Sequence, residues 1–193
     1  MQMNFTEHTY FLMIVIVSFI GFVFENLCTI FVKGCIENRN LFLPFLLGYG
    51  ASVMGCYLLL GIPQPENMVW YFTAVFVLVS LGEILSGKFV EYFCGFSWWD
   101  YTAVPLHITR YTSVPTSIGF AVMITFFMRK CFLPLMRWTA AIPQLIAALA
   151  AKPLFVLLLA DLVVSFQLMC QIQGPNDVWR VQLVRKKYKR LPS

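Results

Sequence analysis

Apolar runs of about twenty residues recur along this chain, and they constrain its fold more than any other feature. A helix of about 20 mostly apolar residues is long enough to cross a lipid bilayer. Of the 193 residues, 60% are hydrophobic and only 12% are charged, and that charged share is about half of the usual value for soluble domains. These proportions exclude water-soluble, disordered and nucleic-acid-binding proteins. They predict an integral membrane protein.

The distribution of the runs predicts an all-α, polytopic transmembrane helix bundle that forms a single domain over residues 1–193. We expect five spans, and a count of four or six stays open. A polar interfacial turn, residues 95–111, separates the third span from the fourth. Residues 138–151 would cover only about 21 Å as a helix, so we expect an amphipathic or re-entrant piece at 138–152. The expected spans are residues 10–32, 44–60, 69–94, 113–128 and 153–170.

The basic residues favour five spans over six. Five spans place ten of the fourteen Lys and Arg residues on one side of the membrane and four on the other, whereas six spans give nine and five. The positive-inside rule then predicts an outside N-terminus and a cytosolic C-terminus. Residues 180–193 form a basic cytosolic tail in this topology. Arg129, Lys130 and Arg137 fit it least well, because they fall on the outer side.

The six cysteines do not form a pattern that binds metal. They are not arranged in any C-x-x-C spacing, and most lie within or beside apolar runs. We therefore expect buried free thiols, with neither a disulfide framework nor a zinc site.

Four acidic residues lie inside the expected spans, where an ionisable side chain costs ~2.5–3.5 kcal/mol on insertion scales. Such residues usually face the interior of a bundle. Glu25 is expected to point inward from the first span. Asp161 either joins a polar site or makes a helix-to-helix hydrogen bond without chemistry.

The other two acids share one face of the third span. Glu83, Gly87 and Glu91 stand at positions i, i+4 and i+8, which places them on the same side of a helix. Gly87 would let a neighbouring helix or a ligand approach the backbone. The alternative for Glu91 is a local ion pair with Lys88.

Two polar segments flank these acids. Trp99 and Tyr101 suit an interfacial aromatic belt, while Asp100, His107 and Arg110 could fold back toward the acids of the first and third spans. Asn38 and Arg39 follow the first span, and composition alone suggests only a solvated, positively charged loop there.

Taken in order, these motifs resemble those of the small bacterial membrane family of ABC-transporter type IV (CmpB-like) permeases, to which the vertebrate transmembrane protein 229 group is similar. The resemblance covers roughly residues 20–112, and the remainder matches only in hydropathy and in Asp161. It departs at Asn40, where the family usually has Gly, and at residues 107–111, where the family tends to have Asn-x-Asn-Gly-Arg. The matching residues are Gly21 and Glu25; Asn38 and Arg39; Pro44, Tyr49 and Gly50; Glu83, Gly87 and Glu91; and Trp99, Asp100, Tyr101 and Pro105.

The resemblance implies a transport role in the bacterial plasma membrane. The chain has no G-x-x-x-x-G-K-[ST] phosphate loop, so an ABC-type function would need a separate nucleotide-binding subunit. Five spans are few for a transport path, so a homo-oligomer or other membrane subunits are expected, with membrane lipid as the surrounding partner. No cofactor, metal or nucleic acid is expected.

Three functions are compatible with these residues. The favoured one is a permease-like component with an intramembrane polar site. The alternatives are an intramembrane enzyme acting on lipid or lipidated peptide, and a non-catalytic scaffold. An enzyme is disfavoured because Cys94 and His107 are a weak candidate for a nucleophile and base. The residues expected to line a polar cavity or ligand site are Glu25, Asn38, Arg39, Glu83, Gly87, Glu91, Trp99, Asp100, Tyr101, His107 and Arg110.

Overall fold

The computed structural model describes residues 5–183, apart from the side chain at position 32. The described part is mostly helical, which confirms the expected fold class, and its short strands form two small two-stranded sheets. The elements, in chain order, are α1 (Glu7–Lys33), β1 (Cys35–Glu37), α2 (Leu47–Leu60), η1 (Pro65–Asn67), α3 (Met68–Cys94), β2 (His107–Thr109), β3 (Thr112–Ser113), α4 (Val114–Lys130), α5 (Phe132–Ala140), α6 (Gln144–Ile172) and β4 (Arg180–Gln182).

Three helices of the described residues, α1, α3 and α6, are long and apolar enough to cross a membrane. The pair α4 and α5 qualifies as a fourth span if the two are taken together, although they are bent by 50° at their junction. The helix α2 has 14 residues and is therefore about 21 Å long, too short to cross the bilayer unaided. The chain is thus a membrane protein with three long apolar helices and up to four such spans, and the count of five stays a prediction.

The last helix corrects one boundary of the sequence analysis. α6 begins at Gln144 and continues through Pro153 to Ile172, so residues 144–152 belong to it rather than to a separate re-entrant piece. A proline inside a helix removes one backbone hydrogen bond, but membrane helices tolerate this where neighbours compensate. Because 138–151 and 153–170 are not two separate helices, the six-span alternative is wrong.

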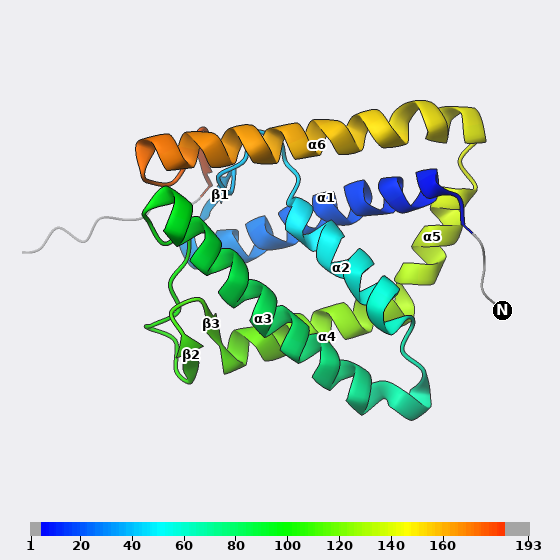
Figure 1. Cartoon of the computed structure of the whole chain (residues 1–193), viewed down its shortest axis with the longest axis horizontal. Coiled ribbons are helices and arrows are strands. Elements are labelled where there is room, and N and C mark those ends of the chain that lie inside the picture. Colours follow the sequence, from blue (N-terminus) through cyan, green and yellow to red (C-terminus); the bar gives the residue numbers. More distant parts are fainter. Residues whose placement is uncertain (1–4, 184–193) are drawn as a thin grey trace, which may run out of the picture.

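The helix α1 lies at the centre of the packing. It contacts α2, α5 and α6, while α3 packs mainly on α4. Figure 1 shows α1 and α6 running side by side along the molecule, with α3 crossing obliquely. Met13, Tyr71, Met128 and Phe132 are fully buried in the main core. Large apolar side chains such as Leu58 remain exposed on the outer helix surfaces, as expected for a protein that contacts lipid.

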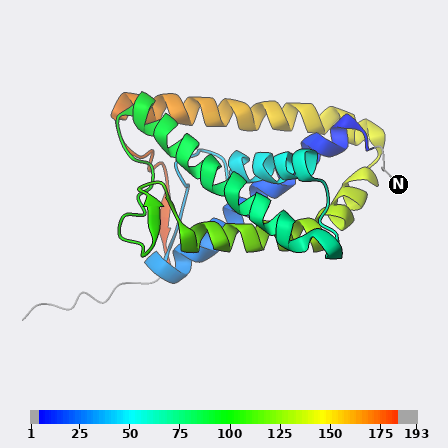
Figure 2. The ribbon, with the colours of Figure 1, turned by 60° about the horizontal axis from the view of Figure 1, so that its bottom comes forward.

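Most of the irregular backbone gathers at one end of the molecule, which we call the polar end (residues 34–46, 95–113 and 173–183). Figure 2 shows the strands there, beside the C-terminal turns of α1, α3 and α6. β4 pairs with β1 in antiparallel register, and Arg180 Nη2 lies 2.8 Å from Glu37 Oε2. The first residues of the predicted basic tail are therefore bound to the body of the protein, and residues 184–193 of that tail lie outside the described range.

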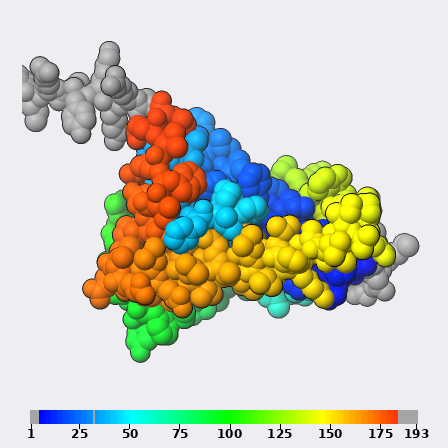
Figure 3. Space-filling view, turned by 90° about the horizontal axis from the view of Figure 1, so that it is seen from above, coloured from blue at the N-terminus to red at the C-terminus, as the bar shows by residue number. Residues whose placement is uncertain are grey.

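Two further contacts hold the polar end, and the last turn of α3 beside it, to α6. Asp161, nearly buried in α6, accepts hydrogen bonds from the backbone N–H groups of Phe42 at 3.0 Å and Leu43 at 3.2 Å. Figure 3 shows the segment that precedes α2, in cyan, lying against the middle of α6. Cys94 of α3 and Cys170 of α6 form a disulfide. The expectation of free thiols throughout was wrong for this pair, which lies 76 residues apart in the chain and which no local spacing could reveal.

Candidate functional site

Glu25 and Arg39 form an ion pair between α1 and the loop that follows it. Arg39 Nη2 lies 2.7 Å from Glu25 Oε2, and its Nη1 lies 3.1 Å from Glu37 Oε1. The Glu25 and Arg39 side chains are 21% and 28% exposed. From α2, the Tyr49 hydroxyl donates to the other Glu25 oxygen at 2.5 Å. Charge-assisted hydrogen bonds of this kind are stronger than neutral ones, so Glu25 is held from two sides.

The backbone around this pair suits the contacts. A Cβ at Gly21 would overlap the Tyr49 ring, so a residue without a side chain is needed there for Tyr49 to reach Glu25. Arg39 and Asn40 both have positive φ angles, 56° and 67°. Asn tolerates the left-handed region better than most residues, which explains how it can replace the glycine that the family usually has at this position.

Glu83 lies in the middle of α3 and contacts the start of α4. The Thr112 hydroxyl donates to Glu83 Oε2 at 2.5 Å, and the Ser117 hydroxyl donates to the same oxygen at 3.3 Å. Thr112 and Ser117 are themselves fully buried. Among the described residues, the hydrogen-bond partners of the Glu83 carboxylate are therefore neutral hydroxyl groups.

Tyr101 connects these two groups. It lies in the turn between α3 and β2, and its side chain is half-buried. Burial, together with the carboxylates of Glu83 and Glu25, raises the pKa of the Tyr101 phenol to about 12, while Arg39 acts against this rise. The phenol thus interacts with residues of both groups. We call this set the polar cluster: Glu25, Arg39, Tyr49, Glu83, Tyr101, Thr112 and Ser117.

A second group of charged side chains, the exposed ion-pair group, consists of Glu91, Asp100 and Arg110. Arg110 Nη1 lies 2.9 Å from Glu91 Oε1, and its Nη2 lies 3.4 Å from Asp100 Oδ2. All three side chains are about 40% exposed. Arg110 reaches the third span at Glu91, whereas Asp100 contacts Arg110. The ion pair of Glu91 among the described residues is with Arg110, not with Lys88.

The remaining predicted site residues have structural contacts. Gly87 is buried beneath the Tyr111 ring, which a Cβ would overlap, so the close approach at this glycine is made by a side chain of the same protein. The Trp99 indole donates to the Tyr111 carbonyl at 2.8 Å. Asn38 is buried and donates to the carbonyls of Leu41 and Asn176.

His107 lies apart from the polar cluster. It is exposed on β2, with its Nδ1 3.3 Å from the Val104 carbonyl. Cys94, which the sequence paired with it as a weak nucleophile candidate, is buried and bonded to Cys170. The described residues contain no group of three His, Cys, Asp or Glu side chains that could hold a metal ion.

Sequence reasoning missed three members of the polar cluster as site residues: Tyr49, Thr112 and Ser117. Tyr49 carried a signal, because it matches the family motif together with Gly21. Thr112 and Ser117 carried none, since hydroxyl residues at the start of a helix usually serve as caps. Ser113 between them does cap α4, accepting from the Thr116 N–H.

The fold defines an α-helical integral membrane protein with a partly buried acidic site between α1, α2, α3 and the start of α4. The model of the family described as "Putative ABC-transporter type IV" matches residues 12–166, and the chain belongs to that family. This match extends well beyond residues 20–112, on which the sequence resemblance rested, and it includes Asp161. Comparisons with curated proteins and with solved structures gave no match.

Proposed function

We propose that this protein is a permease-like membrane component and that the polar cluster binds a proton or a cationic solute on its way through the membrane. The observation that best supports the proposal is the environment of the Glu83 side chain. This carboxylate lies within an apolar helix, where a charge is costly, and its described hydrogen bonds come from hydroxyl groups. A hydroxyl stabilises a carboxylate without neutralising it, so a proton or cation can still supply the missing charge.

Glu25 differs from Glu83 in having a cation beside it. Arg39 holds Glu25 and also contacts Glu37, which is in turn paired with Lys33 and Arg180. The Glu25 side of the cluster is therefore balanced by fixed charges. Tyr101 interacts with both carboxylates, and its phenol can donate or accept a hydrogen bond. We infer that Tyr101 and Tyr49 orient the solute or relay a proton between Glu83 and Glu25.

Charge and the family support the orientation and the partners that we propose. Lys33, Arg39, Lys88, Arg110 and Arg180 belong to the polar end or to the helix turns next to it, so we propose that this end faces the cytosol of a bacterial cell and that the N-terminus is outside. The exposed ion-pair group would stand at the cytosolic mouth. A nucleotide-binding subunit would dock on the same end, and other membrane subunits or a second copy would complete the path.

Flux measurements in liposomes test the proposal. The purified protein is reconstituted with a trapped pH-sensitive dye or, in separate liposomes, a trapped potassium-sensitive dye, and the decay of an imposed proton or potassium gradient is recorded. We expect wild-type protein to speed the decay of at least one gradient. Glu83→Gln should abolish this effect while leaving thermal unfolding in detergent unchanged. Glu91→Gln makes the same chemical change two turns along α3 and should retain the flux.

Two outcomes would count against transport through the cluster. Equal fluxes in Glu83→Gln and wild type, together with a lowered unfolding temperature, would indicate the scaffold alternative. If wild-type protein moves neither protons nor potassium ions faster than empty liposomes do, the proposal is wrong for both ions.

A further inference from the structure

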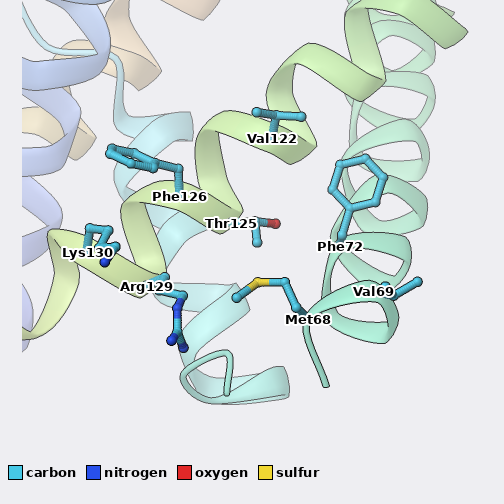
Figure 4. A pocket seen from close by; sticks show the side chains of 8 residues that line it. All are labelled: Met68, Val69, Phe72, Val122, Thr125, Phe126, Arg129 and Lys130. Carbon is cyan, nitrogen blue, oxygen red and sulfur yellow. The ribbon is translucent and has the colours of Figure 1, made fainter. Parts of the chain in front are cut away.

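A groove separate from the polar cluster lies between the first turns of α3 and the last turns of α4. Figure 4 shows Thr125 of α4 and Met68 of α3 on the sides of the two helices that face each other. Its volume is about 420 Å³, which lies within the range of small-molecule pockets, about 300–1,000 Å³. The lining residues are Met68, Val69, Phe72, Val122, Thr125, Phe126, Arg129 and Lys130.

The walls of the groove suit an alkyl chain. On α4, Val122 and Phe126 stand one turn apart, and Met68 and Phe72 are spaced likewise on α3, so each helix presents an apolar ridge. Val122 and Phe126 are 54% and 63% exposed. In a membrane these exposed surfaces meet lipid tails rather than water.

One end of the groove carries positive charge. Arg129 Nη1 donates to the Pro63 carbonyl at 2.9 Å, which fixes the guanidinium at the groove mouth, and the exposed Lys130 follows it. Arg guanidinium and Lys ammonium groups are the usual partners of phosphate oxygens.

A buried hydroxyl lies between the charged mouth and the apolar floor. Thr125 is 7% exposed, and its Oγ1 is buried without a hydrogen-bond partner in the described part of the chain. Figure 4 shows its oxygen pointing from α4 toward α3. Thr125 stands one helical turn deeper in the groove than Arg129. If the anionic group of a ligand binds Arg129, the part of the ligand next to that anionic group lies near Thr125. An unsatisfied buried donor costs about 1–3 kcal/mol, and a carbonyl oxygen would satisfy it.

We propose that this groove binds an anionic phospholipid. Its phosphate contacts Arg129 and Lys130, an ester carbonyl accepts from Thr125, and an acyl chain runs along Phe72 and Val122. The site also gives a reason for basic residues at the end of the molecule opposite the polar end, where the positive-inside rule does not explain them. It does not depend on the transport role of the polar cluster.

Native mass spectrometry of the delipidated protein in detergent tests this site. The protein is titrated with dioleoyl phosphatidylglycerol and, separately, with dioleoyl phosphatidylcholine, which has the same tails. Because two cations near a lipid surface contribute about 1 kcal/mol each, the anionic lipid should bind roughly 30-fold more tightly. The double variant Arg129→Gln/Lys130→Gln should lose this preference. Val122→Trp fills the groove and should weaken the binding of both lipids.

Matched variants separate the groove from the general lipid-facing surface. Val163→Trp changes a valine of similar exposure on α6, and Lys152→Gln removes another exposed lysine; both should bind the two lipids as wild type does. Equal binding of the two lipids by wild type would overturn the proposal. Unchanged binding of phosphatidylglycerol by Val122→Trp would also overturn it. This variant tests the proposal even if the double variant does not fold.

Discussion

Glu83 and Glu91 lie on the same face of α3, two turns apart, yet their surroundings differ in kind. Glu91 is 38% exposed and paired with Arg110, whereas Glu83 contacts two fully buried hydroxyl groups. Spacing along a helix therefore tells which residues share a face but not which of them are neutralised. The difference is made by the segment that packs on α3, namely residues 99–117, which supplies an arginine to one acid and hydroxyls to the other.

The polar cluster and the exposed ion-pair group should differ most in how much stability the protein loses when the arginine of each is removed. Arg39→Gln removes the cation beside Glu25 in a partly buried place, and hydrogen bonds to charged groups are worth about 1.5–3 kcal/mol. Arg110→Gln breaks exposed pairs, which are worth about 0–1 kcal/mol. Chemical unfolding in detergent would measure both. Equal losses in the two variants would mean that the polar cluster is as well solvated as the exposed ion-pair group.

The glycine between the two acids offers a second comparison. Gly87→Ala adds a Cβ that overlaps the Tyr111 ring, and overpacking of this kind costs about 1–3 kcal/mol. Gly82→Ala, on the same helix, adds a Cβ with nothing within 4 Å, and should be neutral or slightly stabilising. Thermal unfolding of the two variants gives the difference. A Gly87→Ala protein as stable as Gly82→Ala would show that Tyr111 does not pack on α3.

Tyr101 should report the negative charge of the polar cluster through its titration. Its pKa is raised to about 12, so the phenol stays protonated in the folded state where an unfolded chain, with a tyrosine pKa of about 10, has begun to ionise. Its contribution to stability is complete below pH about 10 and is lost as the pH rises toward about 12. The titration is measured by the ultraviolet absorbance of phenolate as a function of pH, taken as the difference between wild type and Tyr101→Phe. A midpoint near 10 in the difference would place Tyr101 away from the carboxylates.

Glu91→Gln should have the smallest effect. It removes one exposed ion pair, and we expect a change in unfolding free energy within about 0.5 kcal/mol, as for most surface substitutions. The same thermal unfolding series measures it. A loss as large as that of Arg39→Gln would remove the distinction between the two groups.

The helices could be predicted from the sequence because long apolar runs leave few alternatives. The bounds of α3 differ by one residue at its start from those expected. The start of α6 was missed because Pro153 was treated as a boundary, although a proline within a membrane helix costs only one local hydrogen bond. After the bend, α5 packs on α1, and the hydropathy pattern does not contain this contact.

The candidate site was predictable in its charged residues and not in its neutral ones. Carboxylates in an apolar run are conspicuous, so Glu25 and Glu83 were found, and the family motif drew attention to Arg39 and Tyr101. Which acid meets which cation depends on how residues 95–113 fold over α3. The sequence suggested that Arg110 could fold back toward the acids, but not that it would pair with Glu91 and leave Glu83 to Thr112 and Ser117.

The carboxylate of Asp161 allows a non-helical segment of the chain to pack against the middle of α6. It stands eleven residues before the end of α6, about 16 Å along the helix axis from that end, and two consecutive backbone N–H groups donate to it. Hydrocarbon cannot satisfy such donors, so non-helical backbone at this level must find a protein acceptor. Asp161 takes the place that water has in a surface loop. It thereby allows α2 to start beside the middle of α6, as a helix of only 14 residues whose first turn lies beside Glu25.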